Sequence, residues 1–274
     1  MGEASDLPSY NRNLLDPPGL DEDVLPPPYT ERDPRAAESQ SRAPYRQPTK
    51  PATTKFPPTM NAYFSWKMTS TFHLGSSVKK QLFAASTHAP VVTNRPSVIL
   101  RDGPTDKHPI MATVHADKWG RIKPMRITIP HRPGSTRTLE TQAVPAGTFY
   151  STTPAYTFEV PVGRQTTTRE RFEWRPSHGK EIKELSKGLS SGWNLVWLDG
   201  PVATAVGNRT GRDRGYTSDG REIVAFIAYN GSSDWDKTVR FAFMGTGLEG
   251  TMGEKWEIVV VVTAIQMWFM DQTS

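Results

Sequence analysis

The C-terminal part of the chain contains the stretch Lys255-Trp256-Glu257-Ile258-Val259-Val260-Val261-Val262-Thr263-Ala264-Ile265-Gln266-Met267-Trp268-Phe269-Met270, which is apolar almost throughout. Four consecutive valines favour a β-strand, because β-branched side chains lose rotamer freedom in a helix. The length of the stretch favours a helix, since it exceeds that of an ordinary strand. Thr251 and Glu254 precede it with the spacing of a helix capping box. We therefore expect a C-terminal helix over this stretch.

Such a helix is apolar on nearly all of its faces, so it must be buried in protein or lie in a membrane. From Ile258 to Met270 it would extend about 20 Å, which is short of the ~30 Å hydrocarbon core of a bilayer. A β-barrel around the helix would cover every face. We expect this buried arrangement, with insertion into a membrane as the alternative.

The sequence between residue 62 and the helix contains about a dozen short β-type runs, several of which alternate apolar and polar residues with a period of two. The predicted strands are Ala62–Met68, Ser70–Leu74, Gln81–Ala85, Ser97–Arg101, Ile110–Ala116, Ile122–Ile129, Thr138–Ala143, Tyr156–Val160, Thr168–Trp174, Trp193–Leu198, Glu222–Ala228 and Val239–Met244. Turn residues separate them, and no amphipathic helix is expected between them. This pattern predicts a mainly β fold in which the strands form one closed antiparallel sheet or a sandwich.

The first 58 residues have a different composition. They contain 12 of the 24 prolines but no tryptophan, no isoleucine, one valine and one phenylalanine. Such a segment cannot bury enough apolar surface to offset its ordering entropy. We expect a disordered, proline-rich tail over residues 1–58 and a folded domain over residues 59–274.

Charge is distributed unevenly along the chain. Residues 1–35 contain eight acidic residues and three arginines, a net charge of −5, and since the whole chain carries +5, the remainder carries +10. A positively charged folded domain is compatible with the binding of acidic partners such as anionic lipid. There is no cysteine, which excludes disulfides and thiolate chemistry. The polar, acidic N-terminus lacks the apolar segment of a secretory signal, so we expect a cytoplasmic protein.

Three features together resemble the tubby C-terminal-like superfamily: the strand pattern, the run Arg171-Phe172-Glu173-Trp174-Arg175 followed by Ser191-Gly192-Trp193-Asn194-Leu195-Val196, and the C-terminal helix. That superfamily includes the tubby domain, the phospholipid scramblases and the plant LURP-one-related proteins, and the fungal members are the most similar to this chain. The resemblance covers residues 62–274. It implies a closed barrel of twelve antiparallel strands around a buried C-terminal hydrophobic helix.

The tail contains two motifs typical of WW-domain ligands. Pro26-Pro27-Pro28-Tyr29 fits P-P-x-Y, and Leu7-Pro8-Ser9-Tyr10 is the L-P-x-Y variant. In such ligands a polyproline II turn places prolines in an aromatic groove, and the tyrosine enters a second pocket. The predicted WW-binding residues are Leu7, Pro8, Tyr10, Pro26, Pro27 and Tyr29. Two copies would bind tandem WW domains with avidity, and a HECT-type ubiquitin ligase is a plausible partner; the alternative is a chance match in a proline-rich segment.

For the folded body, the resemblance implies a basic groove that binds phosphoinositide head groups, at the periphery of the plasma membrane. The candidate residues are Arg209, Arg212 and Arg214, together with Lys118, Arg121 and Lys123. The three arginines occupy one glycine-rich segment, where guanidinium groups and backbone amides can surround a phosphate. The alternative is a solvated surface that only prevents edge pairing of the sheet. Nucleic acid is not expected, since aromatic residues do not interleave with the basic ones.

Catalytic signatures are absent from the sequence: the six histidines show no metal-ligand spacing, and there is no nucleophile or nucleotide-binding motif. We expect a non-enzymatic adaptor or membrane-docking protein without a cofactor or a metal. The alternative is a scramblase-like lipid-binding protein with a membrane-inserting C-terminal helix. Animal scramblases would be expected to carry an Asp-rich Ca²⁺-binding segment before this helix, whereas residues 245–254 contain only Glu249 and Glu254.

Overall fold

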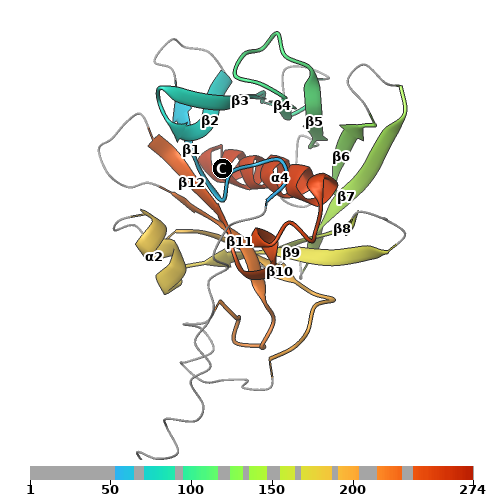
Figure 1. Cartoon of the computed structure of the whole chain (residues 1–274), viewed down its shortest axis with the longest axis vertical. Helices are drawn as coiled ribbons and strands as arrows, with labels where there is room; N and C mark the ends of the chain where they lie inside the picture. Colours follow the sequence, from blue (N-terminus) through green and yellow to red (C-terminus); the bar gives the residue numbers. More distant parts are fainter. Residues whose placement is uncertain are drawn as a thin grey trace, which may run out of the picture. The chain divides into compact units, whose positions relative to one another are not determined.

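The described residues form twelve strands, which pair into one closed antiparallel β-barrel (Figure 1). The structure is a computed structural model, and it describes residues 53–64, 71–89, 95–116, 124–131, 136–146, 155–163, 168–186, 191–203, 215–229 and 237–273. The strands are β1 (Thr59–Phe64), β2 (Thr71–Ser77), β3 (Lys80–Thr87), β4 (Val98–Arg101), β5 (Ile110–His115), β6 (Met125–Pro130), β7 (Thr138–Ala146), β8 (Ala155–Pro161), β9 (Arg169–Ser177), β10 (Gly192–Trp197), β11 (Ile223–Tyr229) and β12 (Lys237–Phe243). Each strand pairs with its neighbours in the sequence, and β1 also pairs with β12, which closes the barrel. All twelve predicted strands are confirmed, with ends that shift by a few residues.

Alternating burial along the strands explains why the sequence pattern predicted them. In β6, Met125, Ile127 and Ile129 are buried, whereas Arg126 is exposed. Successive side chains of a strand point to opposite faces of the sheet. The apolar residues of such strands therefore face the interior of the barrel, and the polar residues face outward.

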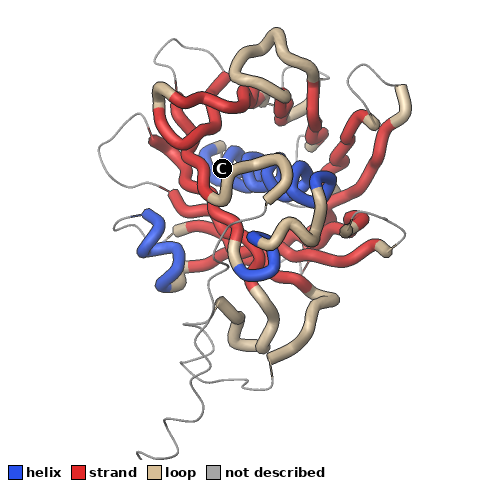
Figure 2. Tube along the Cα trace, viewed as in Figure 1, coloured by secondary structure: helices blue, strands red, loops and turns tan. Residues whose placement is uncertain are grey.

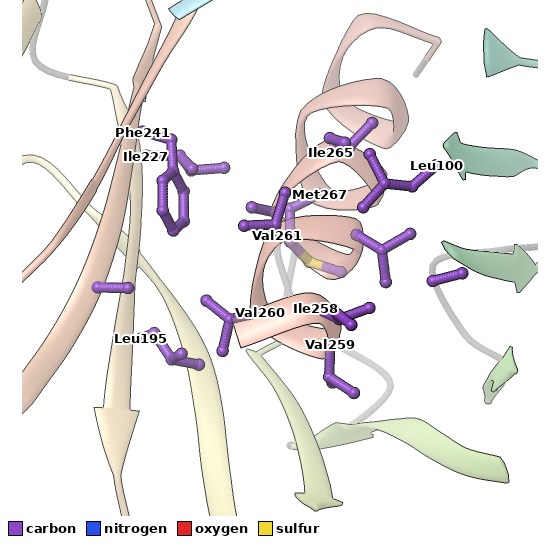
Figure 3. Close-up of a cluster of buried hydrophobic side chains, with 14 of the residues drawn as sticks. Leu100, Leu195, Ile227, Phe241, Ile258, Val259, Val260, Val261, Ile265 and Met267 are labelled. Carbon is purple, nitrogen blue, oxygen red and sulfur yellow. The ribbon is translucent and has the colours of Figure 1, made fainter. Parts of the chain in front are cut away.

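Helix α4 (Glu254–Gln272) fills the interior of the barrel (Figure 2). It is buried along most of its length and contacts β4, β5, β6, β8 and β11, which lie on different sides of the barrel. Figure 3 shows it between Leu100 on one side and Ile227 and Phe241 on the other. This confirms the predicted buried helix and places the four valines in it, because a barrel interior covers all faces of an apolar helix.

The two ends of the barrel are defined by the direction of α4. Because consecutive strands run in opposite directions, the connections between them alternate between the two ends. We call the end where α4 begins the entry end; it also contains the start of β1 at Thr59 and the end of β12 at Phe243. The other end is the exit end, where Asp271 in the last turn of α4 meets Trp193 at the start of β10. All described residues belong to one compact unit of the chain, residues 45–274.

The start of α4 differs from the predicted capping box. A short 3-10 helix, η1 (Gly245–Leu248), follows β12, and the N-cap residue of α4 is Gly253, which makes no side-chain capping hydrogen bond. Gly253 has a φ of 86°, a conformation that favours glycine. A Cβ at this position would lie 3.0 Å from the carbonyl oxygen of Gly163, so the close approach of the β8–β9 connection also favours glycine.

A second helix, α2 (Lys180–Ser186), was not predicted and lies between β9 and β10 in the sequence. It packs on the outside of β11, where Ile182 is fully buried in a small cluster with Phe226, Ala228, Ala242 and Met244. The expectation of no helix between the strands was therefore wrong. A helix of seven residues is too short to show the repeated apolar spacing on which such a prediction depends.

Candidate functional site

The predicted WW-binding residues Leu7, Pro8, Tyr10, Pro26, Pro27 and Tyr29 lie outside the described residues. The described part of the chain begins at residue 53. The WW motifs therefore stay predictions.

The six basic lipid-binding candidates also lie outside the described residues. The strand ends that flank them are described. In the sequence, Lys118, Arg121 and Lys123 lie between β5 and β6, whose facing ends are at the exit end of the barrel. Arg209, Arg212 and Arg214 lie in the sequence between β10 and β11, whose facing ends are at the entry end. We therefore treat the two groups as two separate candidates.

Residues 53–58, which we call the strap, pack at the entry end of the barrel, although the sequence composition assigned them to the tail. Phe56 is only 2% exposed, and its ring centroid lies 4.7 Å from that of Phe83 in β3. Three backbone N–H groups of the strap also bond to the barrel's central helix. The packed body thus includes residues upstream of residue 59.

The carboxylate of Glu257 holds the strap. Glu257 is fully buried in the first turns of α4. Its Oε1 accepts hydrogen bonds from the backbone N–H of Thr54 at 2.7 Å and from Thr54 Oγ1 at 3.0 Å. Its Oε2 accepts from the N–H groups of Lys55 at 2.8 Å and Phe56 at 3.1 Å. Four donors therefore replace the water that this buried charge would otherwise need.

Sequence reasoning missed Glu257 as a structural site, although a signal was present. It is an acidic residue within a helix that we expected to be buried on all faces. A buried charge must be paired or hydrogen-bonded, so its presence implied a set of donors elsewhere in the chain. Those donors could not be identified from the sequence, because they are mainly backbone N–H groups about 200 residues away.

A second contact attaches the strap to the neighbouring connection. Lys55 Nζ lies 2.8 Å from Asp102 Oδ1 in the β4–β5 connection and 3.8 Å from Glu254 Oε1 at the start of α4. The Glu254 side chain is 57% exposed, so this second, longer contact is largely in solvent. Lys55 is thus shared between two carboxylates beside the carboxylate of Glu257.

The last turn of α4 is held at the exit end by a separate cluster. Asp271 Oδ2 accepts hydrogen bonds from Trp193 Nε1 at 2.9 Å and from the Tyr229 hydroxyl at 2.5 Å. A carboxylate is unfavourable at the C-terminal end of a helix because of the helix dipole. The two donors offset this cost and tie the helix to β10 and β11.

Between these ends, Thr263 and Gln266 of α4 are hydrogen-bonded within the barrel, whereas Nε1 of the buried Trp256 has no partner in the described residues. Trp174 Nε1 donates to Thr263 Oγ1 at 2.9 Å, and Ser97 Oγ donates to Gln266 Oε1 at 2.6 Å. A cavity of about 20 Å³ remains between α4 and strands β1, β2, β11 and β12, lined mainly by apolar side chains such as Ala62. Figure 3 shows Ile227 and Phe241, which line this cavity, facing the helix. A space of this size holds about one water molecule.

The outer face of β9 carries ion pairs whose charges are matched locally. Arg171 bonds to Asp199 through both its side chain, at 2.6 Å, and its backbone N–H, at 2.8 Å. The hydrogen bond from the Arg171 side chain is the main reason why the pKa of Asp199 lies below its usual value. Arg175 likewise bonds to Glu173 and Asp219. These arginines are already paired, so they are weaker candidates for a head-group site than unpaired cations would be.

Two further observations concern the described residues as a whole. They contain no group of three histidine, aspartate or glutamate side chains placed to hold a metal ion. Among the helices described, none combines the length and the apolar character needed to cross a membrane.

These features define a class by architecture: a closed twelve-stranded antiparallel β-barrel whose interior is filled by its own C-terminal helix. Comparison with protein-family models, with curated proteins and with solved structures finds no match to this chain.

Proposed function

We propose that the protein is a non-enzymatic adaptor whose tail binds WW domains and whose barrel docks on anionic lipid head groups. The observation that carries the proposal is α4, which fills the interior of the barrel in the described residues and so favours recognition by the outer surface and by the tail. Small-molecule sites in proteins usually have volumes of about 300–1,000 Å³. The cavity beside α4 has about 20 Å³, too little for a substrate or a carried ligand.

The WW-binding half of the proposal rests on the two tyrosine motifs and is tested by substitution. Isolated WW domains of HECT-type ligases would be used to capture the full chain. Capture would then be measured for the Tyr29→Ala and Tyr10→Ala variants and for the double variant. Each aromatic anchor of such a ligand fills its own pocket, and its removal typically costs 2 kcal/mol or more, about thirtyfold in affinity. We expect Tyr29→Ala to weaken capture and the double variant to weaken it further.

Tyr45→Ala is the matched control, since Tyr45 lies in the same tail but follows Ala43-Pro44 and fits neither motif. It should leave capture unchanged. Capture of the double variant at the level of the unsubstituted chain would eliminate the WW proposal. A truncated chain for the same assay should begin at residue 53, so that the strap keeps its hydrogen bonds to Glu257.

The lipid-binding half of the proposal rests on the basic segments and on the proposed membership of the tubby C-terminal-like superfamily. The twelve strands around a C-terminal helix support that membership. The strands that flank the two basic segments in the sequence end at opposite ends of the barrel, so we propose that one membrane surface engages one segment. We favour Arg209, Arg212 and Arg214, since all three are arginines, whose planar guanidinium groups bind phosphate oxygens in a bidentate manner.

Sedimentation with phosphatidylcholine vesicles that contain phosphatidylinositol bisphosphate would test this choice. Each basic residue near an anionic surface contributes about 1 kcal/mol, so replacing all three arginines with glutamine should weaken binding about a hundredfold. Replacing Lys118, Arg121 and Lys123 should have little effect. Glutamine at Arg126, Lys180 and Lys183, which are exposed and lie toward the exit end at the start of β6 and in α2, removes the same charge and serves as the control. Equal losses for all three triple variants would indicate attraction by net charge without a head-group site.

The scramblase-like alternative requires α4 to leave the barrel for the membrane. In the described residues α4 is covered on nearly all faces, and its polar residues bond to strands of the barrel. This arrangement supports the adaptor over the alternative. Carbonate extraction of cell membranes separates the two, because a peripheral adaptor is released and an inserted helix is retained.

A further inference from the structure

Thr54 in the strap combines exposure with a bond to a buried charge. The residue is exposed to solvent, yet its hydroxyl Oγ1 lies 3.0 Å from Oε1 of the fully buried Glu257. Thr54 is therefore a solvent-exposed residue whose hydroxyl contributes to the docking of the strap. No other strap side chain is seen to bond to Glu257 in the described residues.

The charges around this hydroxyl are mostly negative. The carboxylates are Glu257 itself, Glu254 in the same turn of α4, and Asp102 in the β4–β5 connection. In the part of the chain that the structure describes, the cation that pairs with Asp102 and Glu254 is Lys55, at 2.8 Å and 3.8 Å. An added anion at Thr54 would meet repulsion that one shared ammonium group cannot offset.

We propose that Thr54 is a phosphorylation site and that its phosphorylation releases the strap from the barrel. A serine/threonine protein kinase transfers the terminal phosphoryl group of ATP to Thr54. The bond between Oγ1 and phosphorus forms, the bond between that phosphorus and the bridging oxygen of ADP breaks, and the hydroxyl proton passes to a base of the kinase. This regulation goes beyond the adaptor function proposed above and does not depend on it.

Phosphorylation acts on the strap in two ways. It removes the Thr54 hydroxyl donor, and it places a charge of about −1.5 to −2 at hydrogen-bonding distance from a carboxylate. Because the N–H groups of Lys55 and Phe56 bond to the same carboxylate, displacement of Thr54 also weakens those bonds. Phe56 then leaves its position against Phe83, and water reaches Glu257. The released state lengthens the free tail and exposes apolar surface at the entry end.

The test measures how fast a lysine-specific protease cuts the full chain after Lys55, with the cut site identified by mass spectrometry. Thr54→Glu mimics the charge, Thr54→Gln has the same size without charge, and Thr59→Glu adds the same charge at an exposed position of β1. Loss of hydrogen bonds to a charged group predicts cutting at least about tenfold faster in Thr54→Glu than in Thr54→Gln. The protease should cut Thr59→Glu at the same rate as the unsubstituted chain. Circular dichroism would confirm that all variants keep the barrel.

Equal rates for Thr54→Glu and Thr54→Gln would overturn the proposal, because the loss of the hydroxyl alone would then explain any release. The protease should cut a full chain that carries phosphothreonine at position 54 at least as fast as it cuts Thr54→Glu. A rate of cutting slower than that of Thr54→Glu would also overturn the proposal. Finally, the chain isolated from cells under phosphatase inhibition should contain phosphate on the peptide that includes Thr54. Recovery of that peptide only in unmodified form would contradict the assignment of the site.

Discussion

The replacement of Glu257 by glutamine tests whether the strap is held by a buried charge. The carboxylate accepts four hydrogen bonds, two at each oxygen. Glutamine keeps one carbonyl oxygen and presents an amide N–H₂ group to the other two donors, so two bonds are lost. Each hydrogen bond to a charged group contributes about 1.5–3 kcal/mol, and the relief of burying a charge offsets part of the loss. We expect Glu257→Gln to lower the free energy of unfolding by about 3 kcal/mol.

Urea unfolding of the full chain, followed by tryptophan fluorescence, would measure this free energy. Glu254→Gln is the matched control, because Glu254 lies in the same turn but its side chain is 57% exposed and 3.8 Å from Lys55. Its replacement should cost less than about 0.5 kcal/mol. If the two variants lose the same stability, the four hydrogen bonds do not hold the strap in the way the distances indicate.

A truncated chain sharpens the test by removing the donors instead of the acceptor. Without residues 1–58, water takes the place of the strap at Glu257. In that background Glu257→Gln should cost at least about 2 kcal/mol less than in the full chain, since contacting residues are energetically coupled. An unchanged cost would mean that Glu257 stabilises α4 by some other contact.

Three further predictions concern packing and charge. Val261→Ile adds one methylene group on the α4 side of the cavity and should raise the free energy of unfolding by about 1 kcal/mol, measured by urea unfolding. Ile182→Ala should lower it by about 2–4 kcal/mol because Ile182 is fully buried under α2, whereas Ala at the exposed Lys183 should change it little. The pKa of Asp199 is lowered by Arg171, so the pair stabilises the fold above the usual aspartate pKa of about 3.9 and loses this contribution as the pH falls below it. Unfolding curves of Asp199→Asn should therefore converge with those of the unsubstituted chain at acid pH and differ at neutral pH.

The sequence predicted the barrel well because its signals are repeated. Each strand carries a period-two pattern such as Met125, Ile127 and Ile129, and the C-terminal helix is apolar on all faces, which is compatible with few environments other than the centre of a barrel. α2 was missed because its burial rests on Ile182, a single residue that cannot form a pattern.

The candidate sites were harder to predict, for a different physical reason. A short linear motif such as Pro26-Pro27-Pro28-Tyr29 can be identified from local sequence, since its partner supplies the rest of the interface. The binding of the strap depends on Glu257 and on N–H groups about 200 residues away, and any residue other than proline provides such groups. Only the unusual position of a glutamate in an apolar helix was visible in advance.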